Sequence, residues 1–592
     1  MSLIRMVGVR AAAAAVALVI VVVSPARVHA AGSDVADAVM RGDQTGLRAL
    51  LAAGADVNAP QTDGATALHW AVYRGDAATA DLLIEAGANV NAANRNGATP
   101  LSLASVNGDA AMLTLLLEAG ADANESQPFG KTPLMLAARN GNPAALAVLL
   151  DHGADVNAKE SLRGTTALMW AADEAHPAAV ELLIRRGADI SARSDATPRG
   201  RGPALGKAND PRKAVAALGA ALAAGQEALD LRALSALRDS DSATAAAAPA
   251  DANGNDVDEA APPAAPVRRA PRRREPPADG GALTALTYAA RANDVESTRI
   301  LLEAGADVNE VSGYGWSPLL VATQNRYYKL ASFLLDRGAD PNLANKGGWV
   351  PLYLATDNRN IENGDYPVRK PDMDHLEFIT LLLDRGADVN ARVKDSTETR
   401  TVFTNQWLDE DGATAFLRAS QSSDLELMRL LLARGADPTI ATEFNVTALQ
   451  VAAGIGWVEG ITFEWSDEAN VEAVKLLLEL GVDPLIQADT GRTALHGAAH
   501  KGRAEVVQLL VDHGADLAVR DYGNTDNRGG RLAVHTWQAV DYADGLVRVG
   551  VQSAIPHPET GLLIRKLMIA QGLEAPPMGR TLESICITDA CE

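Results

Sequence analysis

Three carboxylates in the last third of the chain have the setting that acid–base chemistry requires. Glu459, Glu464 and Asp467 lie close in sequence to Trp457 and Trp465. An enzyme needs convergent acids with shifted pKa values in a cleft, and aromatic side chains suit the wall of such a cleft. One hypothesis is therefore an enzyme, or a binder of a small sugar or peptide ligand, with its site in this segment.

Other groups of residues have a spacing that could bind an ion, but each is weak evidence for an ion-binding site. His496 and His500 are four residues apart, a metal-competent spacing, but the string His-Gly-Ala-Ala-His lacks the glutamate of a zinc protease. The glycine-rich segment 454–460 is not followed by Lys-Ser/Thr and is no phosphate loop. An aspartate recurs along the chain at Asp56, Asp122, Asp155, Asp307, Asp388 and Asp516. Calcium requires six to eight oxygens converging in one loop, and each of these segments offers one acid at that position. We predict no catalytic residue, no metal and no cofactor.

Two cysteines, Cys586 and Cys591, exclude a disulfide-dense scaffold and a four-cysteine zinc site. Both lie in the tail 576–592. In an oxidising compartment they could close a local disulfide, and free or intermolecular thiols are the alternative.

A repeated string organises most of the 592 residues. Gly54-Ala55-Asp56-Val57-Asn58 is its first copy, and the basic spacing is 33 residues. The glycine recurs at Gly87, Gly120, Gly153, Gly187, Gly305, Gly338, Gly386, Gly435, Gly481 and Gly514. A Leu-Leu-rich stretch precedes each glycine, and about twelve residues after most of them comes a signature such as Thr99-Pro100-Leu101.

These signatures resemble those of the ankyrin repeat family over most of residues 33–575. The resemblance implies a β-turn followed by two antiparallel helices in each unit. Threonine is a good helix N-cap, proline fits the first helical position, and Gly75, Gly108 and Gly141 suit helix ends. A single unit cannot bury its own apolar stripe, so units stack. We predict an all-α helix–turn–helix solenoid with β-turn or hairpin connections.

The family's Thr-Pro-Leu-His histidine is present only at His69 and His496. The resemblance implies that this histidine ties turns together, which is the preferred interpretation of His496. In the remaining units the apolar core has to hold the array.

The repeat positions divide the chain into segments. A signal peptide (1–30) precedes a first block with an N-terminal cap unit (31–194). A linker (195–280) leads to a second block (281–520), a divergent C-terminal cap repeat (521–575) and the tail. The second block carries three insertions, at 361–373, 392–410 and 455–466. Loops of this kind commonly carry function on a repeat scaffold.

The linker itself has two parts. Residues 214–238 are rich in Ala and Leu and are predicted to be partly helical, whereas 240–280 are rich in Ala, Pro and Asp and are predicted to be disordered. The second part contains Arg268, Arg269, Arg272, Arg273 and Arg274. A solvated linker is the preferred interpretation, and docking to an anionic surface is the alternative.

The first thirty residues have the pattern of a secretory signal. Arg5 and Arg10 precede an apolar run at 11–23, and Val28-His29-Ala30 has the small residues of a cleavage site. We predict cleavage after Ala30 and a periplasmic or secreted protein; an uncleaved anchor is the alternative. The excess of Arg over Lys and the abundance of Ala favour a GC-rich bacterium.

Tryptophan usage predicts where a partner binds. Trp70 and Trp170 occupy one slot of the first helix and are predicted to lie in the core. Trp316 and Trp349 precede the Ser/Val-Pro-Leu motifs in turns 33 residues apart, where the resemblance implies an exposed concave edge. The other predicted partner-binding residues are Tyr314, Phe403, Trp407, Trp457, Phe463 and Trp465. For the insertions, folding back onto their own aromatics is an equal alternative.

The formal net charge of −22 argues against nucleic acid, which requires a basic face. We predict an exported, monomeric scaffold that is not an enzyme and binds a protein, with acidity favouring a basic partner. No membrane span is expected after signal cleavage. An effector delivered into another cell is a third class, less favoured because no further translocation motif is present.

Overall fold

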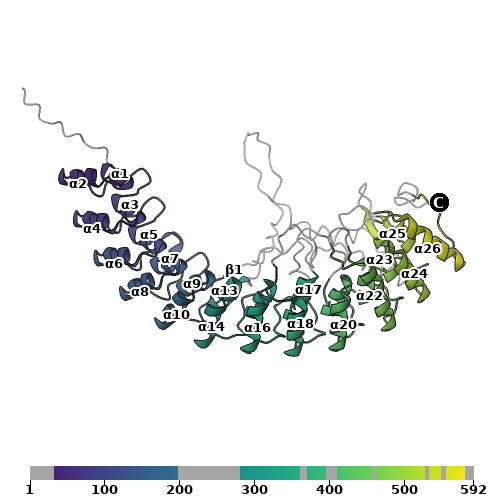
Figure 1. The fold of residues 1–592 in the computed structure, drawn as a ribbon. Helices are drawn as coiled ribbons and strands as arrows, with labels where there is room; N and C mark the ends of the chain where they lie inside the picture. Colours follow the sequence, from purple (N-terminus) through teal and green to yellow (C-terminus); the bar gives the residue numbers. More distant parts are fainter. Residues whose placement is uncertain are drawn as a thin grey trace, which may run out of the picture.

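In the described part of the chain, twelve helix pairs stack side by side into one curved rod (Figure 1). This computed structural model describes residues 33–197, 280–360, 370–394, 410–457, 462–526, 533–547 and 555–580. The first helix of each pair lies on the concave side of the rod and the second on the convex side. The predicted all-α solenoid is confirmed.

The inner helices are α1 (Asp34–Arg41), α3 (Ala67–Tyr73), α5 (Pro100–Asn107), α7 (Pro133–Asn140), α9 (Ala167–Asp173), α13 (Ala285–Ala292), α15 (Pro318–Gln324), α17 (Pro351–Arg359), α19 (Ala415–Gln421), α21 (Ala448–Ala453), α23 (Ala494–Lys501) and α25 (Ala539–Ala543). The outer helices are α2 (Gln44–Ala52), α4 (Ala77–Glu85), α6 (Ala110–Glu118), α8 (Pro143–Asp151), α10 (Pro177–Arg185), α14 (Val295–Glu303), α16 (Tyr328–Asp336), α18 (His375–Asp384), α20 (Leu425–Ala433), α22 (Asp467–Glu479), α24 (Ala504–Asp512) and α26 (Pro558–Ala570). A short 3-10 helix, η1 (Pro128–Gly130), lies in one turn.

Several inner helices begin and end as their residue types predict. In α5, the Thr99 hydroxyl accepts a hydrogen bond from the Ser102 amide at 3.1 Å, and Pro100 occupies the first helical position. Gly108 ends the helix with a φ of +65°, a left-handed conformation that glycine adopts without strain. Local sequence therefore sets where the inner helices start and stop.

The core is built mainly from alanine on the inner helices and leucine on the outer ones. Ala104 and Ala137 are fully buried on α5 and α7, and Leu113 and Leu146 are fully buried on α6 and α8. Small side chains let the inner helices approach closely, while leucine fills the wider spacing between outer helices. This difference in volume curves the rod toward the inner helices.

One asparagine side chain joins most units to the next. The Asn124 amide group donates to the carbonyl of Gly153 at 2.9 Å, and its oxygen accepts from the Asp155 amide at 2.7 Å. We call the set with this bonding the asparagine ladder: Asn58, Asn91, Asn124, Asn157, Asn309, Asn342 and Asn390. Each member satisfies one backbone donor and one backbone acceptor of its neighbour, which fixes the spacing between units.

The ladder has four breaks in the described array, where Ser191, Thr439, Leu485 and Ala518 occupy the asparagine position. Ser191 and Thr439 direct their hydroxyls to Asp189 and Asp437 in their own turns, both at 2.6 Å. The first break coincides with the long insertion between Gly187 and Gly305, and the others lie beyond Gly435. Other contacts must hold the units together there.

The array is continuous across residues 198–279. Helix α9 packs against α13 and α10 against α14, so the two predicted blocks are separate in sequence only. Strands β1 (Ala196–Thr197) and β2 (Gly280–Gly281) pair antiparallel, with Ala196 opposite Gly281. Arg291 of α13 pairs with Asp173 of α9 at 2.6 Å. The insertion therefore leaves and re-enters the array within one hairpin.

The C-terminal end has a second small hairpin, β3 (Asn524–Asp526) with β4 (Ala533–His535), before α25 and α26. The second helix of this cap, α26, extends over Pro558–Ala570. Arg565 and Arg580 both pair with Asp544, at 2.6 and 2.8 Å. None of the helices in the described ranges has both the length and the apolar character needed to cross a membrane.

Replacing Asn124 with alanine should lower the free energy of unfolding by about 1–1.5 kcal/mol, because the exposed Gly153 carbonyl and Asp155 amide exchange their bonds across the junction for bonds to water. Urea unfolding of the full chain, with hydrogen exchange of the Gly153 turn, measures this. The exposed Asn96 is the matched control, and Asn96→Ala should change stability by less than about 0.5 kcal/mol. Equal effects of the two substitutions would contradict the role given to the ladder.

Candidate functional site

The concave face of the first five units exposes two parallel rows in which apolar side chains occupy units two to five of one row and units one to three of the other. One row, at the fourth residue after each helix N-cap, contains Trp70, Leu103, Leu136 and Trp170, all partly exposed. The other, three residues later, contains Met40, Tyr73 and Val106, with exposed fractions of 38%, 67% and 52%. We call these seven residues the concave strip. Apolar rows left open on a continuous surface are typical of protein-interaction sites.

Several of the same positions are closed in the second half of the array. Leu354, Val451 and Tyr542 of the first row are each at most 1% exposed, and Gln421 of the second row is 2% exposed. Val321 is the apolar residue that stays partly exposed there, and the other partly exposed side chains, Gln324, Asp357 and His500, are polar. Among the described residues, the more continuous apolar part of these rows therefore lies in units one to five.

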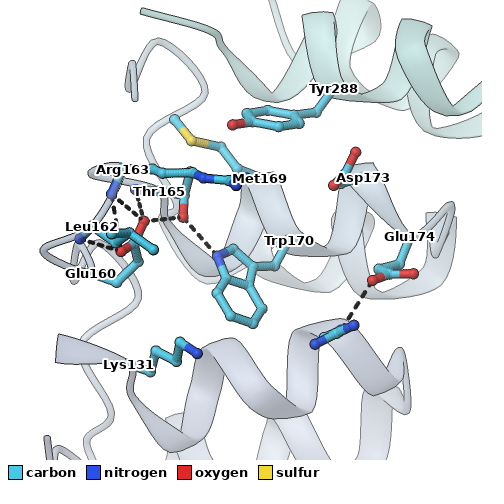
Figure 2. A pocket seen from close by; sticks show the side chains of 11 residues that line it. Lys131, Glu160, Leu162, Arg163, Thr165, Met169, Trp170, Asp173, Glu174 and Tyr288 are labelled. Atoms are coloured by element: carbon cyan, nitrogen blue, oxygen red, sulfur yellow. Dashed lines mark hydrogen bonds and ion pairs between the residues drawn. The ribbon is translucent and has the colours of Figure 1, made fainter. Parts of the chain in front are cut away.

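A cavity of about 340 Å³ lies where the concave strip reaches Trp170 (Figure 2). Its residues come from the inner helices α7, α9 and α13 and from the turns before them. Trp170 lies at the centre of the view, Tyr288 of α13 lies across from it, and Lys131 lies on the α7 side. A cavity of this size suits one or two side chains of a bound polypeptide.

Trp170 is held in place by a chain of hydrogen bonds. Its indole Nε1 donates to the Thr165 hydroxyl at 2.8 Å, and that hydroxyl donates to Glu160 at 2.7 Å. The backbone amides of Leu162 and Arg163 also donate to Glu160, at 2.6 and 2.9 Å. Fixing the ring before binding reduces the entropy lost on association.

Glu160 is ionised in this arrangement. Burial opposes its charge, yet the hydrogen bonds from Thr165, Leu162 and Arg163 hold the pKa of Glu160 below its usual value of 4.5. Its side chain is buried, with an exposed fraction of 3%. The carboxylate therefore serves its own turn and is not open to a ligand.

Trp70, near the start of the concave strip, is also held by a hydrogen bond from its indole to a side chain of the preceding turn. Its Nε1 donates to the Gln61 side chain at 2.7 Å, and its ring meets that of Tyr73 edge-on at 5.7 Å. The prediction that Trp70 and Trp170 are core residues is therefore wrong in part. Each packs one side against the core and leaves the other on the concave face, because the fourth helical position lies at the edge of the buried stripe. The polar residues that precede each tryptophan in the turn, Gln61 and Thr165, were the sequence signal for this partial exposure.

Two predicted contact residues prove to be buried. Trp349 is 2% exposed and meets the Tyr353 ring edge-on at 5.0 Å, and Tyr314 is 6% exposed. The prediction that Trp349 lies on an exposed edge is wrong, because the wide ring of Tyr353, one helical turn further on, packs against its indole. Trp316 lies in the corresponding turn of the preceding unit and is partly buried against the core.

The insertion 455–466 brings its aromatics to the inner helices. Trp457 lies edge-on to His500 at 6.1 Å, and Phe463 lies edge-on to Trp465 at 5.5 Å. Trp465 is 46% exposed and donates from Nε1 to Asn360 at 3.0 Å. This insertion folds back as a brace between units, with one ring left partly open.

The predicted acids do not form a two-carboxylate cleft within the described residues. Glu464 pairs with the fully buried Lys501 and, at 2.9 Å, with Arg503, whereas Asp467 is largely exposed and pairs with Arg503. Burial lowers the pKa of Lys501 to about 8, an effect that Glu464 opposes. Phe403, Trp407 and Glu459 lie outside the described residues, as do residues 1–30 and both cysteines.

The two family histidines tie turns together. The Nδ1 atom of His496 accepts from the Thr493 amide at 3.1 Å, so its Nε2 donates to the Trp537 carbonyl at 3.1 Å. His69 makes the same pair of bonds with Thr66 and Ala98. Burial lowers the pKa of His496 and keeps it neutral. Both nitrogens are occupied, so His496 is not placed to ligate a metal with His500. Among the described residues, no three His, Cys, Asp or Glu side chains group as metal ligands.

Family models match much of the chain. The model described as ankyrin repeats (3 copies) matches residues 35–127, 104–194, 272–345 and 464–535. A model of the single ankyrin repeat matches residues 411–443. A search for similar curated proteins found no match.

Acidification should loosen the turn that positions Trp170. The pKa of Glu160 in the folded protein lies below its usual value of 4.5. The stability that the ionised Glu160 gives the turn is therefore present above pH 4.5 and is lost as the pH falls through the lowered folded-state pKa. Protection factors of amides 162–165, measured by hydrogen exchange, should fall with pH in the wild type and stay low and flat in Glu160→Gln. Glu118→Gln, on an exposed carboxylate of α6, should behave as the wild type. A turn indifferent to both pH and Glu160→Gln would contradict the hydrogen-bond chain.

Glu464→Ala should destabilise the second half by about 3 kcal/mol, because Lys501 is left buried without its partner. The double variant Glu464→Ala/Lys501→Met should recover most of that loss in urea unfolding. The control is Glu472→Ala, which removes an exposed pair with Lys475 and should leave the midpoint unchanged. A double variant as unstable as Glu464→Ala alone would rule out the buried charge as the cause.

Proposed function

Since the chain belongs to the ankyrin repeat family, whose repeats generally mediate protein–protein interaction, we propose that it binds a polypeptide segment of another protein along its concave strip. The observation that carries the proposal is the concave strip, which places at least one exposed or partly exposed apolar side chain on each of units one to five and ends in the Trp170 cavity. The strip follows successive inner helices, so an extended or helical segment lying along it meets one anchor per unit.

The proposed contact surface replaces the one predicted from the sequence. Trp349 and Tyr314 are buried, whereas Trp70 and Tyr73 stand on the concave face with rigid partners behind them. Rigid aromatic anchors with a satisfied polar tip are the residues that most often dominate binding energy. Trp316 and Trp465 remain secondary contacts in this proposal.

Binding without chemistry is the favoured mechanism. Ankyrin repeat proteins are typically non-enzymatic scaffolds. The alternative site at 455–467 is disfavoured because Glu464 is neutralised by Lys501 and Arg503. We propose a monomer that works by surface complementarity.

Export is part of the proposal and rests on the basic, apolar and small-residue pattern of residues 1–30. The chain expressed in its own cell should be recovered outside the inner membrane, with Ala31 as its first residue by mass spectrometry. Recovery of the full-length chain in the cytoplasm would refute export and leave the binding surface untouched.

Removing the anchors should remove binding. In a quantitative pull-down from the compartment that holds the protein, Trp70→Ala/Trp170→Ala should reduce capture of specific partners at least about thirtyfold, as loss of about 2 kcal/mol predicts. Ile569→Ala, an exposed apolar residue on the outer helix α26, is the matched control and should capture as the wild type. Circular dichroism should show both variants folded. Equal capture by wild type and the double tryptophan variant would overturn the proposed surface.

A further inference from the structure

Of the charged residues that line the Trp170 cavity, the acids have partners among the described residues, whereas two of the cations do not. Asp173 is paired with Arg291 at 2.6 Å, and Arg139 is paired with Glu174 at 3.1 Å. Glu160 is buried and accepts hydrogen bonds from its own turn. The acids of this cavity are therefore occupied by neighbouring groups.

Two cations of the same cavity have no such partner. Lys131 and Arg163 both line it, and within the described part of the chain neither side chain forms an ion pair. Figure 2 shows Lys131 on one side of Trp170, with Arg163 on the other side, toward Met169 and Tyr288. Burial raises the pKa of Tyr288, and the charge of Arg291 and, to a smaller extent, that of Arg163 oppose the rise. The cavity thus presents an aromatic wall between two cations that form no ion pair in the described residues, with the buried Glu160 carboxylate as the one lining acid that is also outside an ion pair.

We propose that this cavity selects an acidic side chain of the bound polypeptide, next to an apolar residue that packs on Trp170. The inference rests on the proposed function and names the chemistry of its partner. An aspartate or glutamate placed between Lys131 and Arg163 gains charge-assisted hydrogen bonds from both. The neighbouring apolar residue covers the exposed side of the indole and excludes water from those bonds.

The net negative charge of the whole chain does not oppose the selection of an acidic side chain at this cavity. Exposed charges farther away than the Debye length, about 8 Å at physiological salt, are largely screened. The groups inside the cavity therefore decide which charge is accepted. The basic partner predicted from the overall charge of −22 is replaced, at this cavity, by an acidic segment.

The test uses a phage-displayed library of random linear peptides selected on the full chain. Peptides enriched on the wild type should carry Asp or Glu within about two residues of an aromatic or aliphatic anchor. On Lys131→Glu/Arg163→Glu, those peptides should bind at least about tenfold more weakly, and selection should shift toward Lys and Arg. Arg48→Glu/Lys566→Glu carries the same change in net charge on the outer helices α2 and α26, and it should select as the wild type.

The outcomes distinguish a failure of the acidic specificity from a failure of the proposed binding surface. Enriched peptides that bind Trp170→Ala as tightly as the wild type would overturn the proposed surface itself. Peptides that require Trp170 but carry no acid preference, or keep it on Lys131→Glu/Arg163→Glu, would overturn only the acidic specificity. A requirement for a free C-terminal carboxylate, seen as loss of binding on amidation of synthetic peptides, would also contradict it.

Discussion

One asparagine side chain per unit, bonded to the next unit's backbone, sets the geometry on which the rest of the structure depends. Because Asn124 bonds both the Gly153 carbonyl and the Asp155 amide, its unit and the next can neither slide nor separate without exposing both groups. Repetition of this contact places equivalent residues of each inner helix in rows. The concave strip is one consequence, since residues 33 apart in sequence, such as Tyr73 and Val106, fall side by side.

Where the ladder is absent, the chain uses other contacts. At the first break, the β1–β2 pair and Arg291 with Asp173 join the units on either side of residues 198–279. At the Leu485 break, Glu464 of one unit pairs with the buried Lys501 of the next unit and, at 2.9 Å, with Arg503. Buried pairs of this kind hold a defined geometry more than they add stability. The long insertion at 198–279 coincides with a break of the ladder, yet the helices on either side of it still pack against each other.

The sequence alone predicts the fold because its signals are local and repeated. Threonine caps, helix-ending glycines and Leu-rich stripes recur in register, and each acts within its own unit. The candidate site is harder to predict, because the exposure of each side chain depends on which residues pack against it in the folded structure. Trp349 is buried by Tyr353, and Trp170 is held open by Thr165 and Glu160, and neither pairing follows from the 33-residue period. The charge preference of the cavity depends on pairs such as Asp173 with Arg291, which are 118 residues apart.

The described units on either side of residues 198–279 form one continuous array, and the paired strands β1 and β2 flank this segment. The most direct measurement is hydrogen exchange of a chain in which these residues are replaced by Asn-Gly, a dipeptide that closes tight hairpins. The account predicts that α9, α10, α13 and α14 keep their protection and that the chain unfolds at the same urea concentration. Loss of protection in these four helices, with two separate unfolding transitions, would contradict it.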